Sequence, residues 1–560
     1  ADNSVIMGGT LNTTYTSDVV VISGYSNSAR GVGSTVVGGQ LNVTRSSMSL
    51  VVGGSGNQTY GNLSLAVGGI SNSTNGYNSL TVGGKENTTN DELAMAVGGT
   101  GNNAAAYNSI TVGGTKNVTK GQQALALGGL NSRVEGTNAV ALGGEQNKTS
   151  GDSAVVAGGD NNWASGDKSM VLGGQDNEAR ANLSTVIGGK GNYANSLDAM
   201  VIGGEGNNAN AEYSMVIGGM YNSADAQYAT TIAGTKNTAS AKNAITIGGS
   251  QLNATSSDAV AMGGTGNTVS ASNAIAVGGR SNEAKGYYSA TIAGKENETI
   301  GIGSVALGGK ENIVSGERAL AAGGEGNEAG GYEAMTLGGR LNTAASSFSV
   351  TVAGVNNKAT SENAVVVGGR SNSAMALGAA VLGGASNDAT GRRSLAAGGE
   401  SNKAEGYQSM ALGGLNNIAS SDYSVTIAGE NNVADGHNAV TIGGNTLQAL
   451  NRGAVAMGGT MNVAEASRSV VIGGEYNRTT GYESSVFGGD WNVASGDTAV
   501  AAGGKYNEAN GDYSLAFGGQ SNDSNGLYSV TIAGIYNKAT SENAVAVGGR
   551  SNSATNTGSV

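Results

Sequence analysis

The sequence predicts an all-β protein built as a parallel β-solenoid, and three observations carry this prediction. A glycine recurs every 15 residues from Gly9 to Gly549, 37 times, without an insertion or a deletion. Each repeat contains a segment S-Φ-x-Φ, with Φ apolar, that alternates with period two and is rich in Val, Ile and Thr, as a β-strand is. A unit of this length is too short for helical repeat proteins, whose units have about 34 residues or more.

Each repeat predicts two strands and two turns. The segment Ser169–Leu183 is a representative unit of the consensus S/A-Φ-x-Φ-G-G-x-x-N-x-A/T-x-G-x-x, whose positions are numbered 1 to 15 below. Positions 1–4 predict the first strand, and the glycines at positions 5 and 6 predict a turn because glycine adopts positive φ angles without steric cost. Positions 9–12 predict a second short strand. The sequence therefore predicts one continuous domain, residues 1–560, of about 37 coils stacked into a rod about 180 Å long.

Residues that share one position in successive repeats form a column, and two further columns predict how the coils are held together. Position 9 is asparagine in 34 of the 37 repeats, and the three exceptions are Ser132, Leu252 and Leu447. Identical amides stacked about 4.8 Å apart predict a hydrogen-bonded ladder along the solenoid. Positions 2 and 4 carry no charge in any repeat, so we expect them to face the interior together with the small residue of position 11.

Position 3 predicts an interface with a second copy of the chain. This position should be polar if it faces solvent, yet it holds only Val, Ile, Ala or Thr. A strand that is apolar on both faces is normally buried on both faces, and the sequence contains no second element that would cover the outer face. The sequence therefore predicts a homo-oligomer, and its candidate interface residues are Val156, Val171, Val186, Val201 and Val216.

The composition excludes several classes of function. The chain has 98 glycines, no proline, no cysteine and a net charge of −12, so collagen, disulfide scaffolds and thiolate metal sites are excluded. Proteins that bind nucleic acids carry clusters of Lys and Arg, and the sequence suggests no such cluster. No apolar run is long enough to predict membrane insertion of this segment. The only histidine, His437, falls in a loop position, and the carboxylates are scattered over the loops. We therefore expect no enzyme activity, no cofactor and no bound metal.

The loops carry the candidate binding surface. Position 8 is Met461, Tyr476, Trp491 and Tyr506 in four successive repeats; Ser521 interrupts this run, and Tyr536 resumes it. Residues in one column lie about 4.8 Å apart, so the run predicts a continuous apolar stripe. Two interpretations stay open: the stripe binds a partner, or its side chains stack and stiffen the solenoid. Trp163, at position 10, is a second and weaker candidate.

The repeat resembles that of a known family. The string S-x-V-x-G-G-x-x-N-x-A-x-G-x-x-S, as in Ser409–Ser424 and Ser469–Ser484, is similar to the head repeat of YadA-like trimeric autotransporter adhesins. The resemblance implies a left-handed parallel β-roll and a homotrimer displayed on the bacterial cell surface. Heads of this family bind host extracellular-matrix proteins, host receptors or other bacteria.

The resemblance has a limit, and a rival interpretation remains. The chain shows no neck motif, no heptad stalk and no membrane-anchor strands, so it resembles an excised head whose outer-membrane anchor lies outside it. Phage tail fibres carry related repeats. The alternative function is therefore a purely structural trimeric rod, such as a tail-fibre segment or a spacer.

Overall fold

The computed structural model describes residues 2–560, and within this range it contains strands and turns but no helix. The strands run from β1 (Val5–Met7) and β2 (Thr13–Thr14) to β73 (Val545–Val547) and β74 (Ser553–Ala554). Odd-numbered strands take positions 2–4 of each repeat and even-numbered strands take positions 10–11, so the bounds of all strands advance in steps of 15 residues. The predicted parallel β-solenoid of about 37 coils is confirmed.

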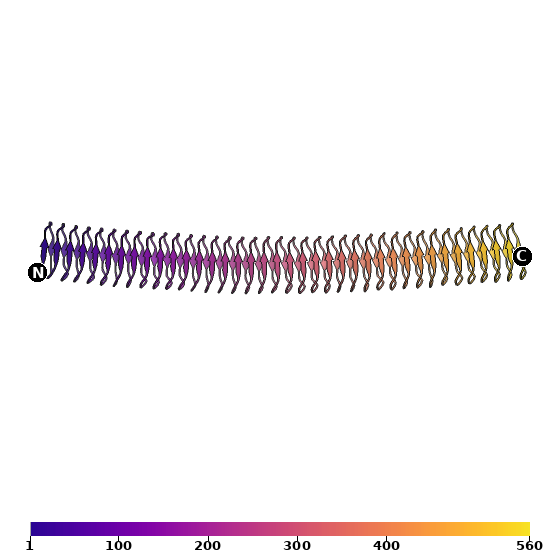
Figure 1. Ribbon diagram of the computed structural model, residues 1–560, viewed down its shortest axis with the longest axis horizontal. Coiled ribbons are helices and arrows are strands. Elements are labelled where there is room, and N and C mark those ends of the chain that lie inside the picture. The colour runs from indigo at the N-terminus through magenta and orange to yellow at the C-terminus, as the bar shows by residue number, and fades with distance from the viewer. Residues whose placement is uncertain (1) are drawn as a thin grey trace. The chain divides into compact units, whose positions relative to one another are not determined.

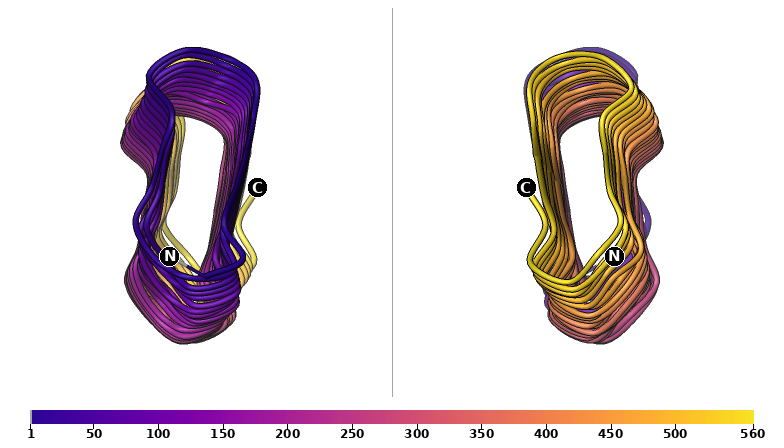
Figure 2. Two further views of the ribbon diagram at one scale, coloured as in Figure 1. Left: turned by 90° about the vertical axis from the view of Figure 1, so that its left-hand side faces the viewer. Right: turned by 90° about the vertical axis from the view of Figure 1, so that its right-hand side faces the viewer.

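The coils form two compact units, the first ending at Arg280 and the second comprising Ser281–Val560. Within each unit the strands pair in parallel with their counterparts one repeat away, as in the register Val156↔Val171↔Val186 of unit 1 (Figure 1). Seen along the stack, each coil is an elongated loop with two long sides joined by two turns (Figure 2). The single domain over residues 1–560 and the left-handed sense of the coil stay predictions.

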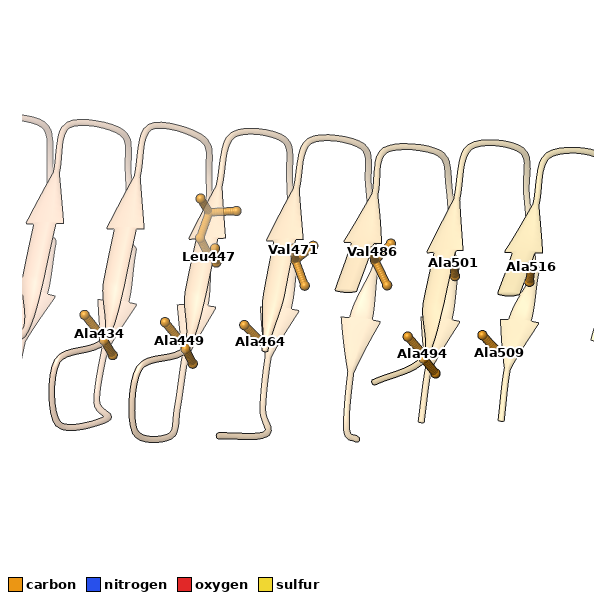
Figure 3. Close-up of a cluster of buried hydrophobic side chains, with 14 residues drawn as sticks. Ala434, Leu447, Ala449, Ala464, Val471, Val486, Ala494, Ala501, Ala509 and Ala516 are labelled. Atoms are coloured by element: carbon orange, nitrogen blue, oxygen red, sulfur yellow. The ribbon is translucent and has the colours of Figure 1, made fainter. Parts of the chain in front are cut away.

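The interior of each coil is narrow and is filled by positions 1, 3, 9 and 11. In the representative unit these are Ser169, Val171, Asn177 and Ala179, each at most 1% exposed. Figure 3 shows the same arrangement in unit 2, where side chains of position 3, among them Val471, form a row beside the alanines of position 11. Both walls contribute small side chains, so the core is thin and closely packed.

The predicted orientation of the first strand is wrong. Val171 is fully buried inside its own chain, whereas Met170 at position 2 is 36% exposed and Leu172 at position 4 is half-buried. The physical reason is size: the gap between the two walls accepts Ala, Val or Thr, and the longer Leu, Met, Ile and Phe side chains of positions 2 and 4 must point outward. The whole candidate interface lies in the core and cannot contact another chain: Val156, Val171, Val186, Val201 and Val216.

The asparagine ladder is present, and it joins side chains to the backbone rather than to one another. Asn177 Nδ2 donates to the carbonyl oxygens of Gly173 at 3.2 Å and of Gly189, in the next coil, at 3.1 Å. Asn177 Oδ1 accepts a hydrogen bond of 3.0 Å from the backbone N–H of Asn192. Each amide therefore satisfies turn carbonyls of two coils and one backbone N–H, which are groups that burial would otherwise leave unpaired.

The exceptions in this column replace the amide by different means. Leu252 and Leu447 are fully buried and fill the space with apolar atoms, as Figure 3 shows for Leu447. Ser132 is too short to do so, and its buried hydroxyl has no hydrogen-bond partner. The repeat thus tolerates loss of the amide at single coils, because the neighbouring coils keep theirs.

Some buried threonines at position 3 have hydroxyl groups without a hydrogen-bond partner. Thr74 Oγ1, at position 11, donates to Thr81 Oγ1, in the next coil, at 2.9 Å across the interior. At Thr336, Thr351 and Thr426, position 11 is alanine both in the same coil and in the preceding one, and the threonine hydroxyl has no partner. An unpaired buried hydroxyl costs about 1–3 kcal/mol.

Replacing these three threonines by valine is therefore expected to stabilise the protein. Each of Thr336→Val, Thr351→Val and Thr426→Val should raise the free energy of unfolding by about 1 kcal/mol, because the new methyl group needs no hydrogen bond. The matched control, Thr81→Val, should lower it by a similar amount because Thr74 loses its acceptor. Thermal unfolding followed by circular dichroism measures both changes. A lower unfolding temperature in the variant that combines all three valine substitutions would contradict this account.

Candidate functional site

The predicted aromatic stripe is an ordered stack on the surface of unit 2. The rings of Tyr476 and Trp491 lie parallel, with centroids 4.3 Å apart and planes within 9° of each other. Tyr506 continues the stack at 6.2 Å from Trp491, tilted by 31°. All three side chains stay between 37% and 45% exposed. The solenoid thus presents one face of an aromatic ladder to the solvent.

The local backbone restricts which side chains this column contains. Position 8 lies in the left-handed region, with φ of 54° at Tyr476 and 57° at Trp491. This conformation disfavours β-branched side chains, and across all repeats position 8 contains only one of them, Thr446. Consecutive residues of the column project side by side because the register advances by one full coil. Met461 and Tyr536, which are 43% and 48% exposed, lie in the same column on either side of the stack.

Charged groups border the stack on one side. Lys505 Nζ lies 5.0 Å from the centroid of the Tyr506 ring and 2.9 Å from Asp490 Oδ2. The hydrogen bond and the negative charge of Asp490 raise the pKa of Lys505 above its ordinary value, so the ammonium is fully charged. The stripe is therefore an apolar platform with a cation fixed at its edge, an arrangement that suits protein recognition.

Trp163 lines a groove in unit 1. Its indole Nε1 donates to Ser150 Oγ at 2.7 Å, and the ammonium of Lys148 lies 4.4 Å from the ring centroid. The groove is about 690 Å³ in volume. It is also lined by Tyr193, which is at position 10 two coils further on, and by Tyr221. This volume falls within the range of small-molecule and peptide-side-chain sites, about 300–1,000 Å³.

Two missing side chains open this groove. Gly191 and Gly206 occupy position 8 in two successive coils, whereas every other glycine at this position has a side chain at position 8 in both neighbouring coils. A Cβ atom at Gly191 would meet nothing within 4 Å, and one at Gly206 would overlap the ring of Tyr221, which folds back over this glycine. Trp163 was expected from the sequence as a candidate, but the groove beside it was not. Two consecutive glycines in a column of side chains are the signal that could have revealed it.

In each unit the odd-numbered strands form one parallel sheet, the long sheet, and its outer face is apolar. Positions 2 and 4 of the odd-numbered strands point outward and carry no charged residue in any repeat. Leu127 is 38% exposed in unit 1, and Phe487 is 46% exposed in unit 2. Soluble monomers rarely expose contiguous apolar surface beyond a few hundred Å². Positions 2 and 4, rather than position 3, are therefore the apolar positions that one chain leaves partly exposed.

The described residues offer no cluster suited to catalysis by a metal. Within residues 2–560 no group of three or more His, Cys, Asp and Glu side chains is placed to hold a metal ion. His437 is exposed, and its Nδ1 lies 2.9 Å from Asn438 Nδ2 beside the ring of Tyr423. Over the same range no helix is long and apolar enough to span a bilayer. The expected absence of enzyme activity stays a prediction.

Comparison of the chain with protein-family models and with curated proteins finds no match. The fold offers two kinds of exposed surface for a function: the aromatic sites on the loops and the apolar face of the long sheet.

Proposed function

We propose that the chain is the head of a trimeric cell-surface adhesin, which presents the aromatic stack to a protein on a host cell, in the extracellular matrix or on another bacterium. The observation that carries this proposal is the stack of Tyr476, Trp491 and Tyr506 at the surface. Aromatic side chains are the most frequent energetic anchors of protein interfaces. Stacking on each other holds these rings in place before binding, which lowers the entropy lost on association.

Assembly through the outer face of the long sheet supports the same proposal. Three copies that place positions 2 and 4 around a common axis would remove the apolar face from water and leave the loops at position 8 outside. The resemblance of the repeat to YadA-like heads is what favours three copies over two. Display on the bacterial surface follows from that resemblance as well.

A structural rod is the second candidate, and one observation favours it. Stacking of Tyr476 on Trp491 at 4.3 Å also stabilises the column without any partner. Aromatic pairs of this kind contribute about 0.5–1.5 kcal/mol beyond the area that they bury. A tail-fibre segment or a spacer would need such stiffening and nothing else.

The double variant Trp491→Ala/Tyr506→Ala separates the two functions. An adhesin should lose most of its binding to its target cells or matrix, because hot-spot truncation costs about 2 kcal/mol or more per anchor, roughly 30-fold in affinity. A structural rod should show only a small decrease in unfolding temperature. Binding of the purified chain to an array of matrix proteins and cells measures the effect.

The matched control for this experiment is Tyr513→Ala/Tyr528→Ala. These two rings stack at 5.0 Å in unit 2 at position 15 rather than position 8, so the variant removes a similar stack from a different column. If both variants bind as the unchanged chain does, the stack is structural and the proposed docking surface is wrong.

A further inference from the structure

A second cavity in unit 1 gathers positive charge in a chain that is acidic as a whole. The chain has 29 Lys and Arg against 41 Asp and Glu. Four of these cations line one cavity of about 390 Å³ on three successive coils: Lys116, Lys120, Arg133 and Lys148. The side-chain amides of Asn131 and Gln146 line it as well.

The repeat register brings these residues together. Arg133 and Lys148 are both at position 10 and pair directly in adjacent even strands, β18 (Arg133–Val134) and β20 (Lys148–Thr149). Lys116 projects from position 8 and Lys120 from position 12, on either side of this column. Like charges placed directly opposite each other in a sheet are destabilising. The pair at position 10 therefore needs at least one negative charge beside it.

Only one carboxylate offsets this charge within the cavity region. Glu135 accepts a hydrogen bond from Arg133 and lies 3.5 Å from Lys148 Nζ. Burial acts to raise the pKa of Glu135, but the hydrogen bond from Arg133 and the charge of Lys148 outweigh it and hold the pKa below its ordinary value. Glu135 is thus ionised and bridges the two cations of position 10. Lys116 and Lys120 form no salt bridge with any described residue.

A pair with reversed signs in unit 2 shows that one counter-charge is sufficient for such a column. Glu283 and Glu298 are paired directly at position 10, and Lys285 at position 12 forms an ion pair with both. The cationic cavity repeats this arrangement with opposite charges and then adds Lys116 and Lys120. These two lysines are in excess of what the sheet needs.

We propose that this cavity binds the sulfate groups of a sulfated polysaccharide. Four cations against one carboxylate select a polyanion, and the two amides supply hydrogen-bond donors for sulfate and hydroxyl oxygens. Single-stranded nucleic acids are held by base stacking on aromatic side chains. None lines the cavity, and the nearby Trp163 ring is already in contact with the Lys148 ammonium, 4.4 Å from its centroid. Val118 is its only large apolar residue, which is too little for insertion into a lipid surface. This site lies in unit 1, away from the aromatic stack, and does not depend on the proposed adhesive function.

The test measures binding of a heparin octasaccharide to the full chain by titration calorimetry at about 150 mM NaCl, where charges are screened beyond about 8 Å. Lys116→Glu/Lys120→Glu should weaken binding about tenfold or more. The control, Lys236→Glu/Lys242→Glu, makes the same change in net charge in the same unit and also replaces a position-8 lysine. It should bind within about twofold of the unchanged chain, and so should Trp491→Ala/Tyr506→Ala.

Several outcomes would overturn this assignment. Equal loss in both lysine variants would show a general charge effect, and equal binding of a desulfated octasaccharide would exclude the sulfate groups as the ligand. Tighter binding of a single-stranded oligonucleotide or of phosphatidylserine vesicles would identify a different polyanion. The replaced lysines are exposed, so each variant should fold, and far-UV circular dichroism checks this.

Discussion

Gly174→Ala is expected to disrupt the coils around it, whereas Gly173→Ala is expected to be tolerated. Both glycines have positive φ angles, 83° and 67°. A Cβ atom at Gly174 would lie closer than 3.0 Å to the Asn177 amide and to the carbonyl of Gly189 in the next coil. At Gly173 the Cβ atom would meet nothing within 4 Å. Alanine at position 5 therefore costs only the free energy of the left-handed backbone conformation, about 1–2 kcal/mol.

The expected loss at Gly174 is more than about 4 kcal/mol of local stability, because both the asparagine ladder and the stacking of coils are affected. Repeat proteins open locally, so hydrogen exchange of the amides in the two adjacent coils is the appropriate measurement. The repeats already contain alanine at position 5, as at Ala233 and Ala293, and never at position 6. Equal protection in the two variants would show that the close approach between coils is not what fixes position 6.

Acidic residues on the outer face of the long sheet are expected to separate the chains. The variant Leu127→Asp/Leu307→Asp/Phe487→Asp places charges in the apolar column of position 4, where these side chains are 38–46% exposed in one chain. Burying three carboxylates from each copy near a common axis would cost several kcal/mol per charge. The mass in solution should therefore fall to that of one chain, while the exposed positions let the coil fold.

The control for this variant changes apolar residues of similar exposure in a loop column. Leu197→Asp/Ile302→Asp/Leu527→Asp adds the same charge at position 14, where the side chains are 37–53% exposed. This variant should keep the mass of the unchanged chain. If it dissociates as readily as the first variant does, net charge rather than the outer face controls assembly.

Most of the fold could be predicted from the sequence because the repeat has an unbroken register. The period fixes the coil, the two-residue alternation around Val171 identifies the strand, and the glycines of positions 5 and 6 identify the turn. The shared column also predicts that Tyr476, Trp491 and Tyr506 lie side by side. These predictions succeed because each concerns residues one coil apart, whose separation is set by backbone hydrogen bonds.

The direction of the side chains was mispredicted because hydrophobicity was considered without size. Position 3 varies only among Ala, Val, Thr and Ile, whereas position 4 ranges from Ala157 to Phe487. A close-packed interior tolerates little variation in volume, so the less variable column is the buried one. The two cavities were missed for another reason. They arise from absent side chains, at Gly191 and Gly206, or from cations at three different positions of neighbouring coils, such as Lys116 and Arg133.

The mass of the unchanged chain in solution, measured by multi-angle light scattering, tests the central claim that the apolar outer face is covered by copies of the chain. The account predicts three times the chain mass of 54.8 kDa. A mass of 54.8 kDa at micromolar concentration would mean that this face stays exposed to water, and it would contradict both the proposed assembly and the trimeric head.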